Sequence, residues 1–314
     1  MAIEKKFIDQ FVNVTSNAAV ASYNFIGKKN KIAADKAAVD SMRNDLNQLN
    51  IKGKIVIGEG ELDEAPMLYI GEKVGTTNGP EIDIAVDPLE GTNFAAYNLP
   101  GALSVIAIAE KNNLFHAPET YMEKISTKVH EKGVVDLDYS TKKNIFNLCE
   151  YLNKKPESIT ACVMDRPRHK DIIDELNILR VKIKLITDGD VSGALLVTDD
   201  KYGVDIFLGI GGGPEGVLAS AALDTFECNF QGRFLFHTED DMRRAKKMGI
   251  KDLTKKYQLK EIIKGDTIFC ATGITSGDLV SGIKRENNEF ITETFVTHKS
   301  TGLKKIIKKI ENRL

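Results

Sequence analysis

Two stretches rich in carboxylates stand where short apolar runs end. The stretch "DIAVDPLEGTNF" places Asp87 and Glu90 close together, directly before Gly91 and Thr92. Carboxylates this close repel one another, so a compact site that holds both needs a cation or a proton between them. Upstream, "IVIGEGELDEAPM" sets Glu59 between two glycines, and the acids that follow it are Glu61, Asp63 and Glu64. Two acid-rich strand ends indicate one shared site.

The chemistry that suits such a site is metal-assisted phosphoryl transfer. A helix that begins at Gly91 and Thr92 would offer backbone amides to a phosphate, while acids nearby hold cations. For this stretch alone a plainer interpretation stays open, in which Glu90 is a first-turn acid and Thr92 a local helix cap. The second acidic stretch favours the metal site, because a turn needs fewer acids; Glu61 and Glu64 are expected to be solvated.

The elements that position these acids follow from periodicity. Apolar residues at helical spacing predict helices up to about Asn50. Short β-branched runs then predict strands that end in acids or glycine, with helices between the later ones. The predicted strands are "GKIVIGEG", "EIDIAVDP", "ALSVIAIAEK", "GVVDLDYS", "ITACVMD", "VKIKLITDGD" and "VDIFLGIGGG". The predicted helices include "HKDIIDELNILR" and "PEGVLASAALD". This alternation predicts an α/β fold whose ligands bind where strands end.

The tail and the domain border are predicted less directly. No Pro/Ser-rich linker divides the chain, so we set a soft border that separates residues 1–157 from residues 158–314. The tail "LKKIIKKIENRL" has apolar residues at helical spacing opposite lysines. It predicts a terminal helix docked on its own domain, with a membrane-surface helix as the alternative.

Composition excludes several classes of protein. The 314 residues carry a formal net charge of -2, so no overall basic field favours nucleic acid as the main partner. The four cysteines form no C-x-x-C pair, which argues against a zinc site or a disulfide framework. The start is too polar for a signal peptide, and "ALSVIAIA" is too short to span a bilayer. We therefore expect a cytoplasmic protein without a membrane or nucleic-acid partner.

A family pattern runs through these stretches. "IGEGELDEAPMLYIGEKVG" followed by "DIAVDPLEGT" resembles the class II fructose-1,6-bisphosphatases, a branch of the lithium-sensitive phosphatase superfamily. The resemblance continues in family order through "APETYMEK", "RPRH", "TDGDVSGALL", "GIGGGPEGVLAS", "GRFL", "KKMGI" and "ATGITSGDL". One such motif would be weak evidence, whereas this series covers nearly the whole chain.

The resemblance implies roles for individual residues. The catalytic positions fall on Asp63 and Thr92. The metal ligands fall on five acids, which suit two or three Mg²⁺ or Mn²⁺ ions: Asp35, Glu59, Asp87, Glu90 and Glu215. The substrate contacts fall on Glu90, Gly91, Thr92, Tyr121, Arg166, Pro167, Arg168, Asp188, Gly189, Asp190 and Gly212.

The resemblance also implies a fold and a reaction. The fold is the layered α-β-α-β-α sugar-phosphatase type with two mixed sheets, and the protein is expected to be a homo-oligomer, either a dimer or a tetramer. The reaction is hydrolysis of the 1-phosphate of fructose 1,6-bisphosphate, a step of gluconeogenesis. The alternatives are sedoheptulose 1,7-bisphosphate or inositol monophosphate as substrate, and a catalytically silent sugar-phosphate binding protein.

Two features depart from the family pattern. Arg166 stands where many relatives are expected to have lysine, so a fork of donors replaces a point charge in the phosphate contact. The segment "FHTEDDMRRAKKMGI" is expected to be shorter than the matching stretch in relatives. This second departure bears on regulation and oligomer contacts rather than on the chemistry.

Overall fold

Two compact units make up the chain. The structure is a computed structural model that describes residues 3–60 and 67–312. Unit 1 comprises Met1–His116 and Ile263–Leu314, and unit 2 comprises Ala117–Ile262. This division differs from the predicted border at residue 157, because the last part of the chain returns to unit 1. There β11 pairs antiparallel with β4 and carries β13 beside it, so the C-terminal strands complete the first sheet.

Unit 1 is built on an eight-stranded mixed sheet with the order β12-β13-β11-β4-β3-β1-β2, and β14 pairs with β13. Only β1 and β3 run parallel as neighbours, and the other pairs are antiparallel. The strands are β1 (Lys52–Ile57), β2 (Lys73–Val74), β3 (Glu81–Glu90), β4 (Leu103–Glu110), β11 (Thr267–Gly273), β12 (Lys284–Glu286), β13 (Glu289–His298) and β14 (Leu303–Asn312).

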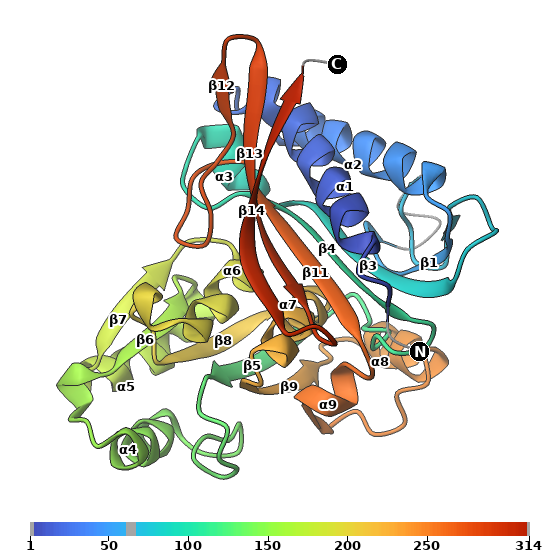
Figure 1. Ribbon diagram of the computed structural model, residues 1–314. Coiled ribbons are helices and arrows are strands. Elements are labelled where there is room, and N and C mark those ends of the chain that lie inside the picture. Colours follow the sequence, from blue (N-terminus) through green and yellow to red (C-terminus); the bar gives the residue numbers. More distant parts are fainter. Residues whose placement is uncertain (1–2, 61–66, 313–314) are drawn as a thin grey trace. The chain divides into compact units, whose positions relative to one another are not determined.

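Two long helices pack on this sheet, and they confirm the predicted helical start of the chain. α1 (Phe7–Ser22) and α2 (Lys31–Gln48) lie side by side in blue in Figure 1. Their apolar stripes, which include Phe11 and Met42, join the sheet residues Ile84 and Ile106 in one buried core. A short 3₁₀ helix, η1 (Tyr23–Phe25), lies between the two helices, and the side chain of Asn30 caps α2.

The tail is a strand, so the prediction of a terminal helix was wrong. β14 pairs with β13 along its whole length, and Gly302, at φ 63°, forms the turn between them. Alternate side chains then face opposite ways: Ile307 packs on the core, whereas Ile306 and Ile310 are exposed. Hydrogen bonding to β13 overrides the helical spacing of the apolar residues.

Unit 2 contains a six-stranded mixed sheet with the order β10-β9-β5-β8-β6-β7. β6, β7 and β8 are parallel, and β5 runs antiparallel between β8 and β9. The strands are β5 (Tyr121–Thr127), β6 (Thr160–Met164), β7 (Lys182–Ile186), β8 (Ile206–Gly212), β9 (Asn229–Leu235) and β10 (Lys256–Gln258). The two sheets confirm the predicted α/β class with two mixed sheets.

Helices cover both faces of the second sheet. α4 (Thr141–Leu152) and α5 (Lys170–Ile178) share one apolar core with it, while α6 (Asp190–Leu195) and α7 (Gly213–Thr225) pack on the opposite face. The remaining helices are α8 (Glu239–Lys247), α9 (Leu259–Ile262), η2 (Pro156–Ser158), η3 (Pro167–His169), η4 (Leu196–Thr198) and η5 (Asp200–Tyr202). α3 (Thr92–Tyr97) belongs to unit 1.

One predicted strand of unit 2 is absent from the described structure. Residues 133–140, "GVVDLDYS", form turns before α4. The backbone amide of Asp136 donates to the side chain of Asn144 at 2.8 Å, and that of Leu137 donates to the side chain of Gln231 at 2.9 Å. Side chains thus bind the amides that a neighbouring strand would otherwise have bound.

Candidate active site

The end of β3 and the turn after it carry four of the predicted residues, which are Asp87, Glu90, Gly91 and Thr92. The strand ends at Glu90, Gly91 adopts a left-handed conformation with φ 77°, and α3 begins at Thr92. The pairing of β3 with β4 shifts register between Asp87 and Glu90, which is a bulge. A bulge changes the direction in which side chains point and is common next to active sites. The sequence predicted the helix start correctly, but the strand runs to Glu90, two residues beyond the predicted end at Pro88.

Thr92 does not cap this helix. The capping position is Gly91, and within the described residues α3 receives no hydrogen bond from a capping side chain. Thr92 is the first helical residue and is half-buried. The interpretation of Thr92 as a local cap is therefore wrong.

Glu59 lies at the same edge of the sheet as Asp87 and Glu90. It follows β1, which runs parallel to β3, so both strands end at that edge. Gly58 allows the close approach of the next loop, because a Cβ atom there would lie 1.8 Å from the carbonyl oxygen of Leu68. The predicted residue Asp63, with Glu61 and Glu64, lies outside the described residues.

The acids of unit 1 suit a divalent cation in their chemistry. Glu90 is buried, and Asp35, Glu59 and Asp87 are half-buried. Burial raises the pKa of the Asp35 carboxyl. Carboxylate oxygens are the donors that Mg²⁺ and Mn²⁺ prefer, so the residue types fit such ions. Among residues 3–60 and 67–312, however, no three His, Cys, Asp or Glu side chains lie close enough together to hold a metal ion.

In unit 2 the predicted substrate residues gather at one edge of the sheet. Parallel strands β6, β7 and β8 end there, and antiparallel β5 begins there, with Tyr121 opposite Gly212. The segments that follow two of these strands carry the remaining substrate positions: Arg166, Pro167 and Arg168 after β6, and Asp188, Gly189 and Asp190 after β7. The predicted metal ligand Glu215 follows β8, in the first turn of α7. This edge is where α/β sheets bind ligands.

Two arginines are held in place at this edge. The Arg168 guanidinium lies 4.9 Å from the centroid of the Tyr121 ring, and its Nε donates to the carbonyl oxygen of Ile210 at 2.9 Å. Arg166 forms an ion pair of 3.8 Å with Asp188. Forked guanidinium groups fixed in this way bind phosphate oxygens in pairs. The arrangement fits a phosphate group better than a neutral ligand.

Glycines bring two carboxylates against the backbone. A Cβ atom on Gly211 would lie 1.9 Å from Asp190, and one on Gly212 would lie 1.8 Å from Glu215. Burial raises the pKa of the Glu215 carboxyl, which the Lys124 ammonium opposes and the Asp190 carboxylate reinforces. The glycine run therefore positions acids.

Lys124 contacts two of the predicted site residues, Asp190 and Gly212, and was not itself predicted. It lies in the middle of β5, is almost fully buried, and donates to Asp190 and to the carbonyl oxygen of Gly212. A signal was present in the stretch "YMEKIST". In a strand, Lys124 must share a face with Met122 and Ser126, both buried, and a lysine on a buried face needs a specific partner.

His169 joins two of the strands that form this edge. Its Nδ1 donates to the carbonyl oxygen of Met164 at 2.7 Å, and its Nε2 accepts from the backbone amide of Ile210 at 2.7 Å. The second bond requires the neutral ring, because a protonated Nε2 could not accept it, and burial lowers the pKa of His169. This histidine is structural.

The free energy of unfolding should therefore decrease as the pH is lowered, because His169 must then take up a proton. A lowered pKa in the folded protein gives stability that is complete above the ordinary value of about 6.5 and is lost as the pH falls, by at most about 1.4 kcal/mol per pH unit. The free energy of unfolding, measured by urea denaturation between about pH 7 and pH 5, should drop more steeply for the wild type than for His169→Gln. Parallel slopes would contradict a neutral structural His169.

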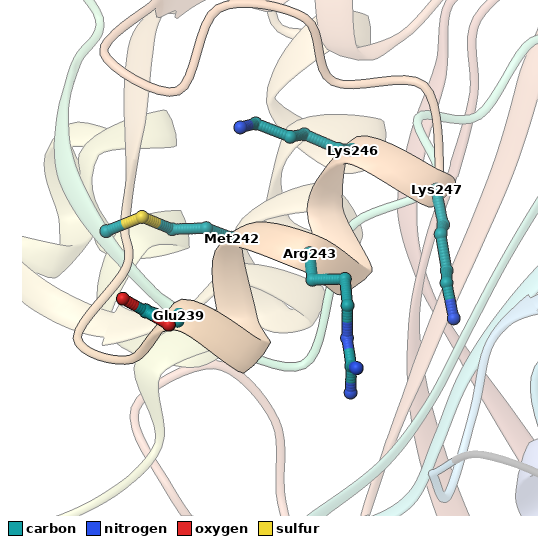
Figure 2. Close-up of a pocket in the computed structure, with 5 residues that line it drawn as sticks. All are labelled: Glu239, Met242, Arg243, Lys246 and Lys247. Atoms are coloured by element: carbon teal, nitrogen blue, oxygen red, sulfur yellow. The ribbon is translucent and has the colours of Figure 1, made fainter.

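A separate pocket lies along α8. Its volume is about 580 Å³, and Figure 2 shows its five lining side chains, with Arg243 and Lys247 pointing to one side of the helix. These lining residues are Glu239, Met242, Arg243, Lys246 and Lys247. They lie in "FHTEDDMRRAKKMGI", the segment that was expected to depart from the family pattern, and they include no predicted site residue.

The comparisons with known proteins identify the family. The model of the bacterial, glpX-encoded fructose-1,6-bisphosphatases matches residues 5–311. The chain belongs to this family. It is 41% identical over 317 residues to the class 2 fructose-1,6-bisphosphatase 1 of Escherichia coli K12, covering 96% of this chain and 93% of that protein. The family resemblance inferred from the motifs is thus confirmed.

Cyanobacterial relatives carry a double name. The class 2 fructose-1,6-bisphosphatase/sedoheptulose-1,7-bisphosphatase of Synechococcus sp. JA-3-3Ab is 41% identical over 312 residues, covering 91% of this chain and 90% of that protein. The protein of the same name in Thermosynechococcus vestitus BP-1 is 42% identical over 301 residues, covering 88% and 87%. Membership in this fructose-1,6-bisphosphatase family makes the chain a phosphatase. No helix in its described parts is long and apolar enough to cross a membrane.

Proposed function

We propose that this chain hydrolyses the 1-phosphate of fructose 1,6-bisphosphate to give fructose 6-phosphate and phosphate, with Mg²⁺ or Mn²⁺ as cofactor. The observation that carries the proposal is the family match over residues 5–311. Acids at one strand edge of unit 1 and paired arginines at one strand edge of unit 2 support it. The first group suits cations, and the second suits a phosphate ester.

The acids of unit 1 would hold the cations. Two or three divalent ions per site would supply positive charge to the phosphoryl oxygens and lower the pKa of a bound water. The Thr92 hydroxyl, oriented by Asp63, would hold the attacking water in line with the bond to the leaving group. The cation ligands that the family resemblance implies are Asp35, Glu59, Asp87, Glu90 and Glu215.

The side chains of unit 2 would bind the sugar phosphate. Arg166 and Arg168 would hold the phosphate that is not cleaved, with Pro167 fixing the segment between them, and Tyr121 supports Arg168. Carboxylates after β7 accept hydrogen bonds from sugar hydroxyls, as acids do in sugar sites generally. The proposed contacts here are Asp188, Gly189, Asp190 and Gly212, and those in unit 1 are Glu90, Gly91 and Thr92.

Sedoheptulose 1,7-bisphosphate is the second candidate substrate, because relatives that are about two-fifths identical carry both activities in their names. The silent-binder alternative is disfavoured, since the acids and Thr92 are all present. Inositol monophosphate has no comparable support among these relatives.

A panel of substrates separates these candidates. Phosphate release should be fastest with fructose 1,6-bisphosphate, measurable with sedoheptulose 1,7-bisphosphate, and at least about 100-fold slower in kcat/KM with inositol 1-phosphate, because a site that binds a second phosphate discriminates strongly against a ligand without it. Equal rates with inositol 1-phosphate would contradict the assigned role of the two arginines.

We also propose that the protein is cytoplasmic. All four cysteines are buried and form no disulfide in the described part of the chain, which suits a reducing compartment.

We further propose that the protein is a homo-oligomer, a dimer or a tetramer. Light scattering of the purified chain would give the mass of the assembly, and a monomer would contradict the proposal.

A further inference from the structure

A buried ammonium group lies among the proposed sugar-phosphate contacts of unit 2. The Lys124 side chain is 1% exposed, and Nζ donates to the Asp190 carboxylate and, at 2.7 Å, to the carbonyl oxygen of Gly212. Asp190 follows β7 and Gly212 ends β8, so Lys124 on β5 connects two turns of the same edge. A charge this deeply buried costs much free energy and requires good partners.

The Asp190 carboxylate is fixed by one oxygen only. Oδ2 accepts from Lys124, and the absence of a side chain on Gly211 lets this oxygen lie against the backbone. Oδ1 is buried and has no hydrogen-bond partner among the residues that the structure describes. An unsatisfied buried acceptor costs free energy, so ligand binding should bring a donor to this oxygen.

We propose that Lys124 is a positioning residue, which holds Asp190 so that its second oxygen accepts a hydrogen bond from a hydroxyl of the sugar phosphate. This inference rests on the proposed function. The Gly212 carbonyl holds the ammonium, and the ammonium holds the carboxylate. Lys124 itself touches no substrate atom; it acts through Asp190 and so determines affinity for the sugar rather than the chemical step.

The first test replaces the lysine with an uncharged side chain of similar length. Lys124→Met should raise KM for fructose 1,6-bisphosphate by about 10-fold or more while kcat stays within about threefold, because one lost orienting contact weakens binding alone. Lys128→Met is the matched control: this exposed lysine of the same unit pairs with Asp200, and its loss should leave both constants unchanged. Unchanged KM in Lys124→Met, with a lower melting temperature or active fraction, would show a merely structural lysine and overturn the proposal.

A double-mutant cycle tests the route through Asp190. Asp190→Asn alone and Asp190→Asn combined with Lys124→Met should have KM values within about twofold of each other, because Lys124 has nothing to position once the carboxylate is gone. A KM that rises as the product of the two single effects would overturn the proposal.

If Lys124→Met does not fold, the comparison of the double variant with Asp190→Asn still tests the proposal, because the double variant buries no unpaired charge. Its KM then has to match that of Asp190→Asn. A wild-type protein inactive on fructose 1,6-bisphosphate would overturn the proposed function and this inference together. An active wild type with an additive cycle would overturn the role of Lys124 alone.

Discussion

Asp87→Asn and Glu59→Gln should each lower the maximal rate of phosphate release by at least about 100-fold while the protein stays folded. Each amide keeps the shape of the acid and removes the charge that holds the cation. The half-buried acids lie at the same edge of the first sheet, so both losses should also raise the divalent-cation concentration needed for half-maximal activity. Steady-state rates at varied Mg²⁺ and Mn²⁺ measure both effects.

Glu81→Gln is the matched control for these variants. Glu81 opens the same strand, β3, is exposed, and pairs with Lys111 at 2.9 Å. Its neutralisation should change neither the maximal rate nor the cation requirement, since exposed ion pairs contribute little. If Asp87→Asn instead unfolds and keeps full activity per folded molecule, the acids are structural and the metal assignment fails.

Thr92→Ala should cut the maximal rate by at least about 100-fold, the lower end of what positioned proton transfer contributes. Because α3 is not capped by Thr92, the loss of stability should stay well below the roughly 1 kcal/mol of a lost cap. Thr92→Ser keeps the hydroxyl and should retain much of the rate. KM should change little, because the groups that hold the phosphate remain.

Asp63→Asn extends this test to the partner of the hydroxyl. If Asp63 orients Thr92, the two single variants should resemble each other, and the double variant should lose far less than the product of the separate losses. Thermal denaturation of all three variants measures how much stability each one has lost. A Thr92→Ala protein that is less stable yet has a near-normal maximal rate would remove Thr92 and Asp63 from the mechanism.

The sequence predicted best those parts of the site that depend on local order. "VDPLEGT" predicted the helix start at Gly91 and Thr92, because glycine readily adopts the left-handed conformation that precedes α3, although the strand continues past Pro88 to Glu90. The parallel strands of unit 2 were recognisable for the same reason. Each is a short apolar run that ends in Asp or Gly, and this pattern also places the arginines and acids at one edge.

The errors concern residues whose conformation depends on distant partners. The tail has a helical pattern, but ten residues of β14 lie against β13. Residues 133–140 have a strand pattern, but the side chain of Gln231, far along the chain, binds one of their amides. The border near residue 157 missed that the last strands return to the first sheet. Such long-range pairing leaves no periodic signal in a single sequence.

Lys124 was not predicted for the same reason, because its contact with Asp190 depends on long-range pairing. The alternation in "YMEKIST" places Lys124 on the face of Met122, but only the structure shows that α6 and α7 cover this face of the sheet. Its acid partner, Asp190, was already a predicted contact, but nothing in the sequence connects β5 with the turn after β7. The sheet order β5-β8-β6-β7 brings them together, because Asp190 after β7 lies against Gly211 of β8, the strand next to β5.

Phosphate release from fructose 1,6-bisphosphate, measured with Mg²⁺, with Mn²⁺ and with excess chelator, tests the central claim most directly. We expect release of one phosphate per sugar with at least one of the two ions, and a fall of at least about 1000-fold in chelator, because carboxylates cannot approach a phosphate without cations between them. Restoring the ion should restore the rate. Undiminished release in chelator, or no release with either ion, would contradict the assignment of this chain as a metal-dependent sugar bisphosphatase.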